Sequence, residues 1–141
     1  MHDTKRIIHM NKDLLDKLVN KYQITLIVLF GSYAENKVRE DSDIDIGIYL
    51  ANKIGVKEET NLIEDMVHAF KRDNIDLVIL NTASPVLRFE VVRNGKLLFE
   101  RTQGDFLQFK LLSMKRYWEY SRFQKYSKMY MDKKEKRLGF V

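Results

Sequence analysis

Asp43 and Asp45 lie two positions apart at the start of the segment DIDIGIYL, residues 43–50. On a β-strand, residues i and i+2 point to the same face, so these two carboxylates stand side by side. Like charges at that spacing repel each other unless a cation lies between them. A hard cation such as Mg²⁺ fits, particularly when phosphate oxygens and water complete its coordination. The pair therefore predicts a metal site that also holds a phosphate compound.

Two further features have the same chemical character. Asp76 lies at the start of the apolar segment IDLVIL, residues 75–80, and Gly31-Ser32 follows the apolar run TLIVLF. If the strands are neighbours, three carboxylates converge and can hold two metal ions, which supports in-line displacement at phosphorus. A glycine at a strand end lets the backbone approach a ligand, and a serine hydroxyl with free N–H groups can bind phosphate. Together they predict a nucleoside triphosphate site.

Three rival motifs fail on their own positions. A P-loop needs glycine at 36 and serine or threonine at 38, where the chain has Asn36 and Val38. A calcium-binding EF-hand loop starting at Asp41 needs glycine and glutamate where the chain has Ile46 and Asn52. The Gly-x-Ser-x-Gly elbow of serine hydrolases is absent from the sequence.

The elements that must position these residues alternate along the chain. Apolar runs predict strands over 25–30, 43–50 and 75–80, and a short edge strand over 96–100. Helical periodicity predicts helices over about 11–21 with Asn11 as cap, 57–72, 85–94 and 105–131, and 32–40 could form a short one. Ser84-Pro85 is a good helix start, and Gly95 is expected to end that helix in the left-handed conformation. This order predicts an α/β (α+β) fold, a small mixed sheet with helices packed on it.

Length and charge limit the organisation of the chain. Its 141 residues suit a single domain, which we divide into a core at 1–100 and a C-terminal extension at 101–141. The core holds 14 Lys+Arg against 16 Asp+Glu, whereas the extension holds 11 against 4. Because no apolar run approaches the ~20 residues that span a bilayer, and cysteine is absent, we expect a cytoplasmic protein without a membrane partner.

The extension is rich in aromatic residues at helical spacing. One stripe, expected to pack on the domain, contains Leu107, Leu111, Met114 and Trp118. A second, offset stripe contains Phe109, Leu112, Tyr120, Phe123 and Tyr130. One helix on a small domain can hardly bury both, and aromatic residues rimmed by Lys and Arg suit a protein interface. Single-stranded nucleic acid is the less favoured ligand. The alternative without any ligand is that the helix folds back or self-associates and buries both stripes.

At the chemistry-bearing residues the sequence resembles a known group. LFGSYA…DSDIDIGIYL is similar to the Gly-Ser-x10-Asp-x-Asp signature of the DNA polymerase β-like nucleotidyltransferases. The short chain and SPVLRFEVVRNGKLLFE resemble the minimal nucleotidyltransferases that serve as antitoxins of HEPN–MNT toxin–antitoxin pairs. Many relatives have glycine where this chain has Asn36, a residue that tolerates the left-handed conformation better than most.

The resemblance implies a role for each matching residue. Gly31 and Ser32 would bind the nucleotide phosphates, Asp43 and Asp45 would bind Mg²⁺, and Asp76 would complete a second metal site and help deprotonate the acceptor. The implied reaction transfers AMP from ATP to a tyrosine of a HEPN RNase toxin, with the toxin bound through the 105–131 helix, in a hetero-oligomer or homo-oligomer. The alternatives are a non-catalytic antitoxin that acts by binding, and nucleotidyl transfer to a small molecule.

Overall fold

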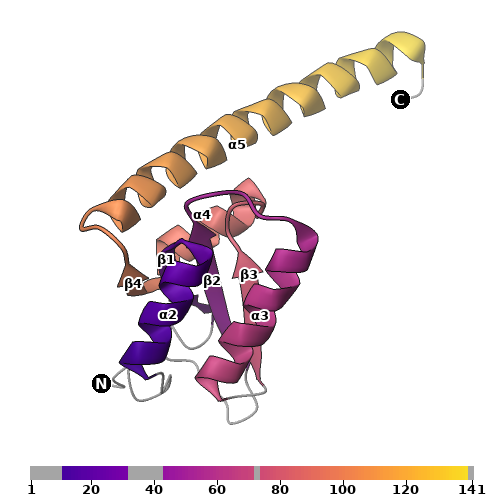
Figure 1. Cartoon of the computed structure of the whole chain (residues 1–141). Helices are drawn as coiled ribbons and strands as arrows, with labels where there is room; N and C mark the ends of the chain where they lie inside the picture. The colour runs from indigo at the N-terminus through magenta and orange to yellow at the C-terminus, as the bar shows by residue number, and fades with distance from the viewer. Residues whose placement is uncertain (1–10, 32–42, 72–73, 140–141) are drawn as a thin grey trace.

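A computed structural model describes residues 11–31, 43–71 and 74–139. Its helices are α2 (Lys12–Tyr22), α3 (Val56–Phe70), α4 (Pro85–Asn94) and α5 (Asp105–Leu138). Its strands are β1 (Ile24–Phe30), β2 (Ile44–Leu50), β3 (Ile75–Ile79) and β4 (Lys96–Glu100). Each expected helix and strand in these ranges is present, whereas the possible helix over 32–40 lies outside them. Figure 1 shows α5 crossing one end of the domain and projecting beyond it.

The four strands form one mixed sheet in the order β3-β2-β1-β4. β1 pairs antiparallel with both β2 and β4, and β2 pairs parallel with β3. The short 96–100 strand is at the edge, as its length predicts. Asn81, just after β3, links the end of β3 to β2. Its side-chain amide donates a hydrogen bond to the Leu50 carbonyl at 2.8 Å and accepts one from the Leu50 N–H at 2.9 Å.

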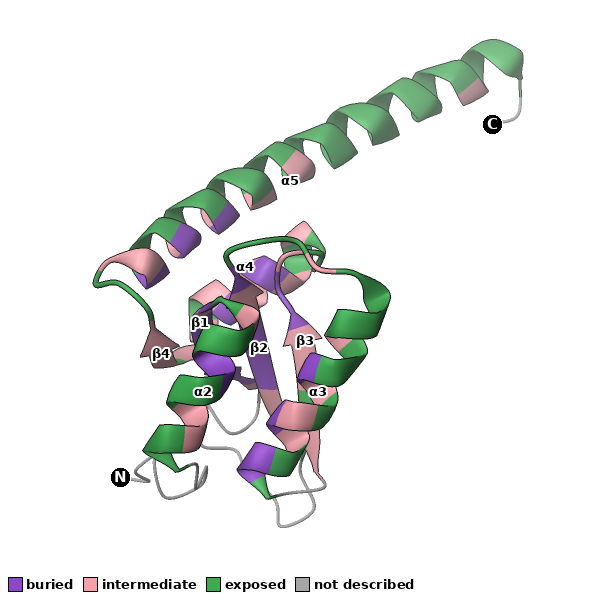
Figure 2. Ribbon diagram, in the orientation of Figure 1, coloured by how far each residue is buried: buried purple, intermediate pink, exposed green. Residues whose placement is uncertain are grey.

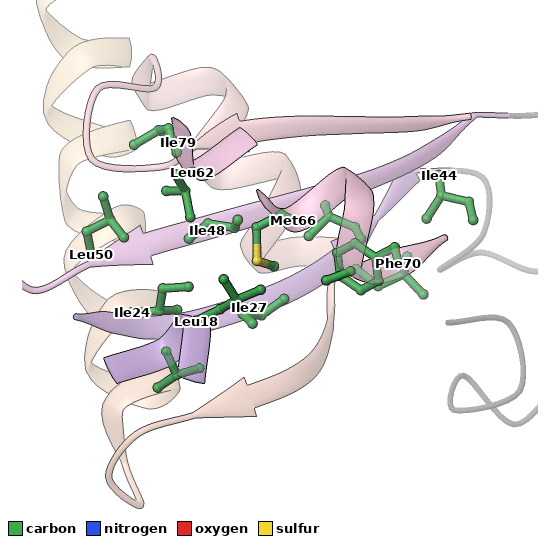
Figure 3. Packing of buried hydrophobic residues seen from close by; sticks show 14 residues of the cluster. Leu18, Ile24, Ile27, Ile44, Ile48, Leu50, Leu62, Met66, Phe70 and Ile79 are labelled. Atoms are coloured by element: carbon green, nitrogen blue, oxygen red, sulfur yellow. The ribbon is translucent and has the colours of Figure 1, made fainter. Parts of the chain in front are cut away.

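Apolar side chains cover both faces of the sheet. On one face the β2 residues Ile44, Ile46 and Ile48 pack with Met66 and Phe70 of α3 and with side chains of α2 (Figure 3). On the other face Leu26, Val28 and Phe30 of β1 pack with α4 and with the first turns of α5. β1 is therefore apolar on both sides, which explains its continuous apolar sequence. The alternation in β2 instead leaves Asp45 on the α4 and α5 side.

Local capping chemistry sets two helix starts as expected. The Asn11 side chain accepts a hydrogen bond from the Asp13 N–H at 2.9 Å, and the Ser84 hydroxyl accepts one from the Leu87 N–H at 3.1 Å. α4 ends at Asn94 as expected, but the left-handed conformation expected for Gly95 was wrong, because its φ is −73°. A Cβ at Gly95 would overlap the Val91 carbonyl, so packing rather than a left-handed turn requires glycine there.

The start of α5 is anchored to the sheet. The Arg101 guanidinium donates to the Ile24 carbonyl at 3.1 Å and to the Val19 carbonyl at 2.8 Å. The Glu100 carboxylate accepts a hydrogen bond from the Phe106 N–H at 3.1 Å, which satisfies one of the free N–H groups of the first turn. These contacts fix the direction in which α5 leaves β4.

The packed face of α5 differs from the expected one. Phe106, Phe109 and Ser113 are buried against the domain, whereas Leu107, Leu111 and Trp118 are exposed. Their helical spacing was read correctly, but α5 is rotated so that another face meets α4. α5 also runs to Leu138, seven residues beyond the expected end, and it is exposed from residue 121 onward apart from Glu135 (Figure 2). Every helix in the described ranges is too short or too polar to span a lipid bilayer.

Candidate active site

Two of the predicted carboxylates meet across the sheet. In the parallel β2–β3 pair, Asp45 is directly opposite Asp76, and in the antiparallel β1–β2 pair Asp45 is opposite Phe30. Asp43 comes one residue before β2, so the three acidic side chains belong to the same edge of the sheet. Asp45 is half-buried, whereas Asp43 and Asp76 are exposed. The strand pairing predicted from the sequence thus brings Asp45 and Asp76 together.

Gly31 brings the end of β1 against Asp45. It follows Phe30 and has a φ of +72°, a conformation that L side chains rarely adopt. A Cβ added at Gly31 would overlap the Asp45 Oδ2 atom. Only glycine therefore leaves this carboxylate oxygen uncovered at the turn. Ser32, the other residue expected at the nucleotide phosphates, lies outside the described residues, as do Asn36, Lys37 and Arg39.

Among the described residues, the charges that act on Asp45 are those of two other carboxylates. Burial raises the pKa of Asp45, and the charges of Asp76 and Asp43 raise it further. The salt bridge within the described ranges instead joins Lys21 to Asp65, on α2 and α3. A cation placed between these carboxylates would relieve their repulsion.

The donor set suits a divalent cation with oxygen ligands. Among the described residues, no three acidic or histidine side chains form a ready-made metal-binding group. Hard carboxylate oxygens, an exposed edge and a glycine that leaves Oδ2 of Asp45 uncovered fit Mg²⁺, which commonly binds one or two carboxylates and completes its shell with phosphate and water.

Gly47 supports the site in a way that the sequence reading did not identify. A Cβ at Gly47 would come within 3.0 Å of the Leu80 side chain, so glycine lets Leu80 pack against β2 two residues beyond Asp45. The available signal was a glycine inside a strand, which often marks a close approach of another group.

A second polar feature lies farther along the same face of β2. Arg88 of α4 is only 2% exposed, and its Nε and Nη2 atoms have no hydrogen-bond partner among the described residues. Its guanidinium lies 4.8 Å from the centre of the Phe109 ring and 5.5 Å from that of Tyr49. Burial lowers the pKa of Arg88, and the charge of Arg116 lowers it further. Nothing in the sequence distinguished this arginine from a surface residue.

The fold and the acidic edge define a nucleotidyltransferase-type domain. Residues 12–104 match the family described as polymerase beta, nucleotidyltransferase. The chain is also 36% identical over 98 residues to protein adenylyltransferase MntA of Shewanella oneidensis, covering 68% of this chain and 70% of that protein. The chain belongs to this polymerase β nucleotidyltransferase family.

Solved structures extend the similarity to most of the chain. A chain in a crystal structure of a toxin–antitoxin with AMP-PNP superimposes with a TM-score of 0.66 at 30% identity, covering 88% of this chain and 98% of that one. A chain in a complex of tri-AMPylated Shewanella oneidensis HEPN toxin with MNT antitoxin superimposes with a TM-score of 0.60 at 29% identity, covering 86% and 92%. The predicted polymerase β-like fold is confirmed.

Proposed function

We propose that this protein is a protein adenylyltransferase that transfers AMP from ATP to a tyrosine hydroxyl of a HEPN-type toxin and thereby acts as an antitoxin. The observation that carries the proposal is the pairing of Asp45 with Asp76 beside Gly31. It occurs in a chain that is 36% identical to a protein adenylyltransferase. The structural relatives named above add a nucleotide analogue in one case and an AMPylated HEPN toxin in the other.

The proposed reaction is an in-line displacement at the α-phosphorus of ATP. The tyrosine oxygen forms a bond to that phosphorus, the bond to the β-phosphate oxygen breaks, and pyrophosphate leaves. The tyrosine proton must be removed, because a phenol with a pKa of about 10 is a weak nucleophile at neutral pH. Asp76 is the group that we assign to accept it, since it is exposed at the strand edge directly opposite Asp45.

Asp43 and Asp45 have a different task in the proposal. They would hold Mg²⁺, with Asp76 completing a second site, while Gly31 and Ser32 would bind the triphosphate. Bound Mg²⁺ would supply charge neutralisation at the phosphates. The rigid mount for Asp45 is β2, whose alternate residues Ile44 and Ile46 are fully buried in the core below.

The decisive experiment uses the full chain, purified HEPN-type partner, Mg²⁺ and α-labelled ATP. Label on a tyrosine of the partner is expected with the wild type and is expected to be lost with Asp45→Asn. An exposed aspartate on α2, Asp16, gives the matched control Asp16→Asn, which should label normally. Absence of label with the wild type, with or without RNA present, would sink the proposal.

The same variant separates the two alternatives. An antitoxin that acts only by binding would still neutralise its partner as Asp45→Asn, whereas the proposed enzyme would not. Transfer to a small molecule would give label on added hydroxyl compounds in the absence of any protein partner.

A further inference from the structure

α5 carries an apolar stripe that the domain does not cover. Relative to Leu112, and at about 100° per residue, Phe123, Tyr126 and Tyr130 lie within about 40° of one line along the helix. Phe123 is 70% exposed, Tyr126 68% and Tyr130 66%, and Leu112 is also exposed. We call these four residues the distal stripe. The buried residues Phe106, Phe109 and Ser113 lie about 60–120° around the helix from Leu112, so packing on the domain leaves the stripe exposed.

The distal stripe is embedded in the most basic part of the chain. Residues 121–138 hold seven Lys+Arg against two Asp+Glu, a balance of +5 that equals the net charge of all 141 residues. An apolar line of aromatic residues rimmed by cations matches the composition of protein interfaces, in which aromatic residues and arginine dominate binding. Glu119 lies within the stripe, between Leu112 and Phe123, and a carboxylate there disfavours a phosphate backbone. The complementary occupant is an acidic protein surface with an apolar centre.

The distal stripe is also far from the candidate catalytic carboxylates. Tyr49 is four residues beyond Asp45 on β2, a separation of about 13 Å along the strand. The Tyr49 ring contacts Phe109 of α5, with 4.9 Å between ring centres. From Phe109, α5 runs 21 residues to Tyr130, about 30 Å along its axis. Figure 1 shows that this part of α5 projects away from the sheet.

We propose that the distal stripe is a docking surface for the toxin, which would bind it through an acidic surface with an apolar centre, separate from the site that receives the acceptor tyrosine. This inference rests on the proposed function, because it takes the toxin as the partner. A toxin held on the stripe is tethered near the active site at high effective concentration, while its acceptor tyrosine is presented to Asp45 independently. Loss of the stripe should therefore weaken the capture of toxin and leave the chemical step nearly intact.

The test compares two surfaces of the same helix. One variant combines Phe123→Ser, Tyr126→Ser and Tyr130→Ser, and the control is Trp118→Ser, a residue 61% exposed on a different face of α5. Affinity for the toxin is measured by calorimetry in an Asp45→Asn background, so that no modification occurs. The triple variant should bind at least about tenfold more weakly, and the control should bind like its parent. Equal binding by all three proteins would overturn the proposal.

Kinetics and competing ligands provide the second arm. With active enzyme, the triple variant should show a KM for toxin raised about tenfold or more and a kcat within about twofold of wild type. A fall in kcat at unchanged KM would overturn the separation of docking from catalysis. So would a triple variant that loses only affinity for a single-stranded RNA oligonucleotide, or only self-association in sedimentation. If the wild type binds toxin but transfers no AMP, the proposed function fails while the calorimetric result still decides the docking surface.

Discussion

At the scale of single residues, Asp45 combines partial burial with two like charges nearby. Its raised pKa means that the folded chain holds the Asp45 proton more tightly than the unfolded chain does. Stability is therefore greater below the unfolded pKa of about 3.9, and it falls as the pH rises through the folded value. This loss of stability is the expected consequence of placing a carboxylate where it can bind a cation.

Asp45→Asn should therefore stabilise the metal-free protein at pH 7 and have little effect near pH 3. The reason is that asparagine removes the repelled charge, which protonation already removes in acid. Thermal unfolding across this pH range without divalent metal measures the difference, and added Mg²⁺ should raise the Tm of the wild type but not that of Asp45→Asn. Asp16→Asn serves as the control, and a difference in Tm that is constant with pH would contradict the assignment.

Gly31→Ala should damage both folding and activity. Alanine is strained at a φ of +72°, by roughly 1–2 kcal/mol, and its Cβ would also overlap Asp45 Oδ2. We expect a matching loss of unfolding free energy in urea and loss of AMP transfer. Gly55→Ala is the control, because Gly55 has a φ of −78° and open space around its Cβ position. A Gly31→Ala protein as stable and active as the control would refute the close approach.

At the level of secondary-structure elements, the α4–α5 contact is stabilised by aromatic stacking and also contains the buried side chain of Arg88. Phe89 and Tyr117 stack with ring centres 4.0 Å apart. Within the part of the chain that the structure describes, two nitrogens of the buried Arg88 and the Oγ atom of Ser113 have no hydrogen-bond partner. The contact is thus built mainly from apolar and aromatic packing rather than from polar pairing.

Arg88→Met should raise the free energy of unfolding by about 1–2 kcal/mol, because a buried charge without an acidic partner is costly and methionine can fill similar space. Urea denaturation measures the change, and the exposed Arg93 on the same helix provides the control Arg93→Met. Lower stability of Arg88→Met would show instead that its contacts with the Phe109 and Tyr49 rings outweigh the cost of burying the charge.

At the scale of the whole molecule, α5 has two parts with different roles. Up to about residue 120 one side of α5 packs on the domain, mainly against α4, and beyond that the helix is exposed (Figure 2). A chain ending at residue 120 should keep the wild-type Tm within a few degrees and lose tight toxin binding. A chain ending at residue 104 should be strongly destabilised, because it uncovers the cluster that Phe106 and Phe109 complete. Differential scanning calorimetry with a binding assay checks both, and equal stability of the two truncations would contradict this division.

The order of helices and strands along the chain can be read from the sequence, and so can the acidic residues proposed for the site. Apolar periodicity and capping are local properties, so they are visible in TLIVLF, in DIDIGIYL and at Ser84-Pro85. The Asp-x-Asp pair is equally local, because the two-residue repeat of a strand fixes its common face. The partition of the chain at residue 100 and the roles of Gly31, Ser32 and the three aspartates stay predictions for the experiments above.

The register of the strands and the rotation of the helices are set by long-range packing, which the local sequence does not show. The direct opposition of Asp45 and Asp76 depends on how β2 and β3 pair, and the burial of Phe109 rather than Leu111 depends on how α5 rotates against α4. α5 is apolar on more than one face, so its own periodicity could not select the face that packs. Glycine is likewise required at position 95 because a Cβ there would overlap Val91 and Val28, and not because the backbone is left-handed. The local sequence does not select between the apolar faces of α5. Long-range packing buries one of these faces and leaves the distal stripe exposed.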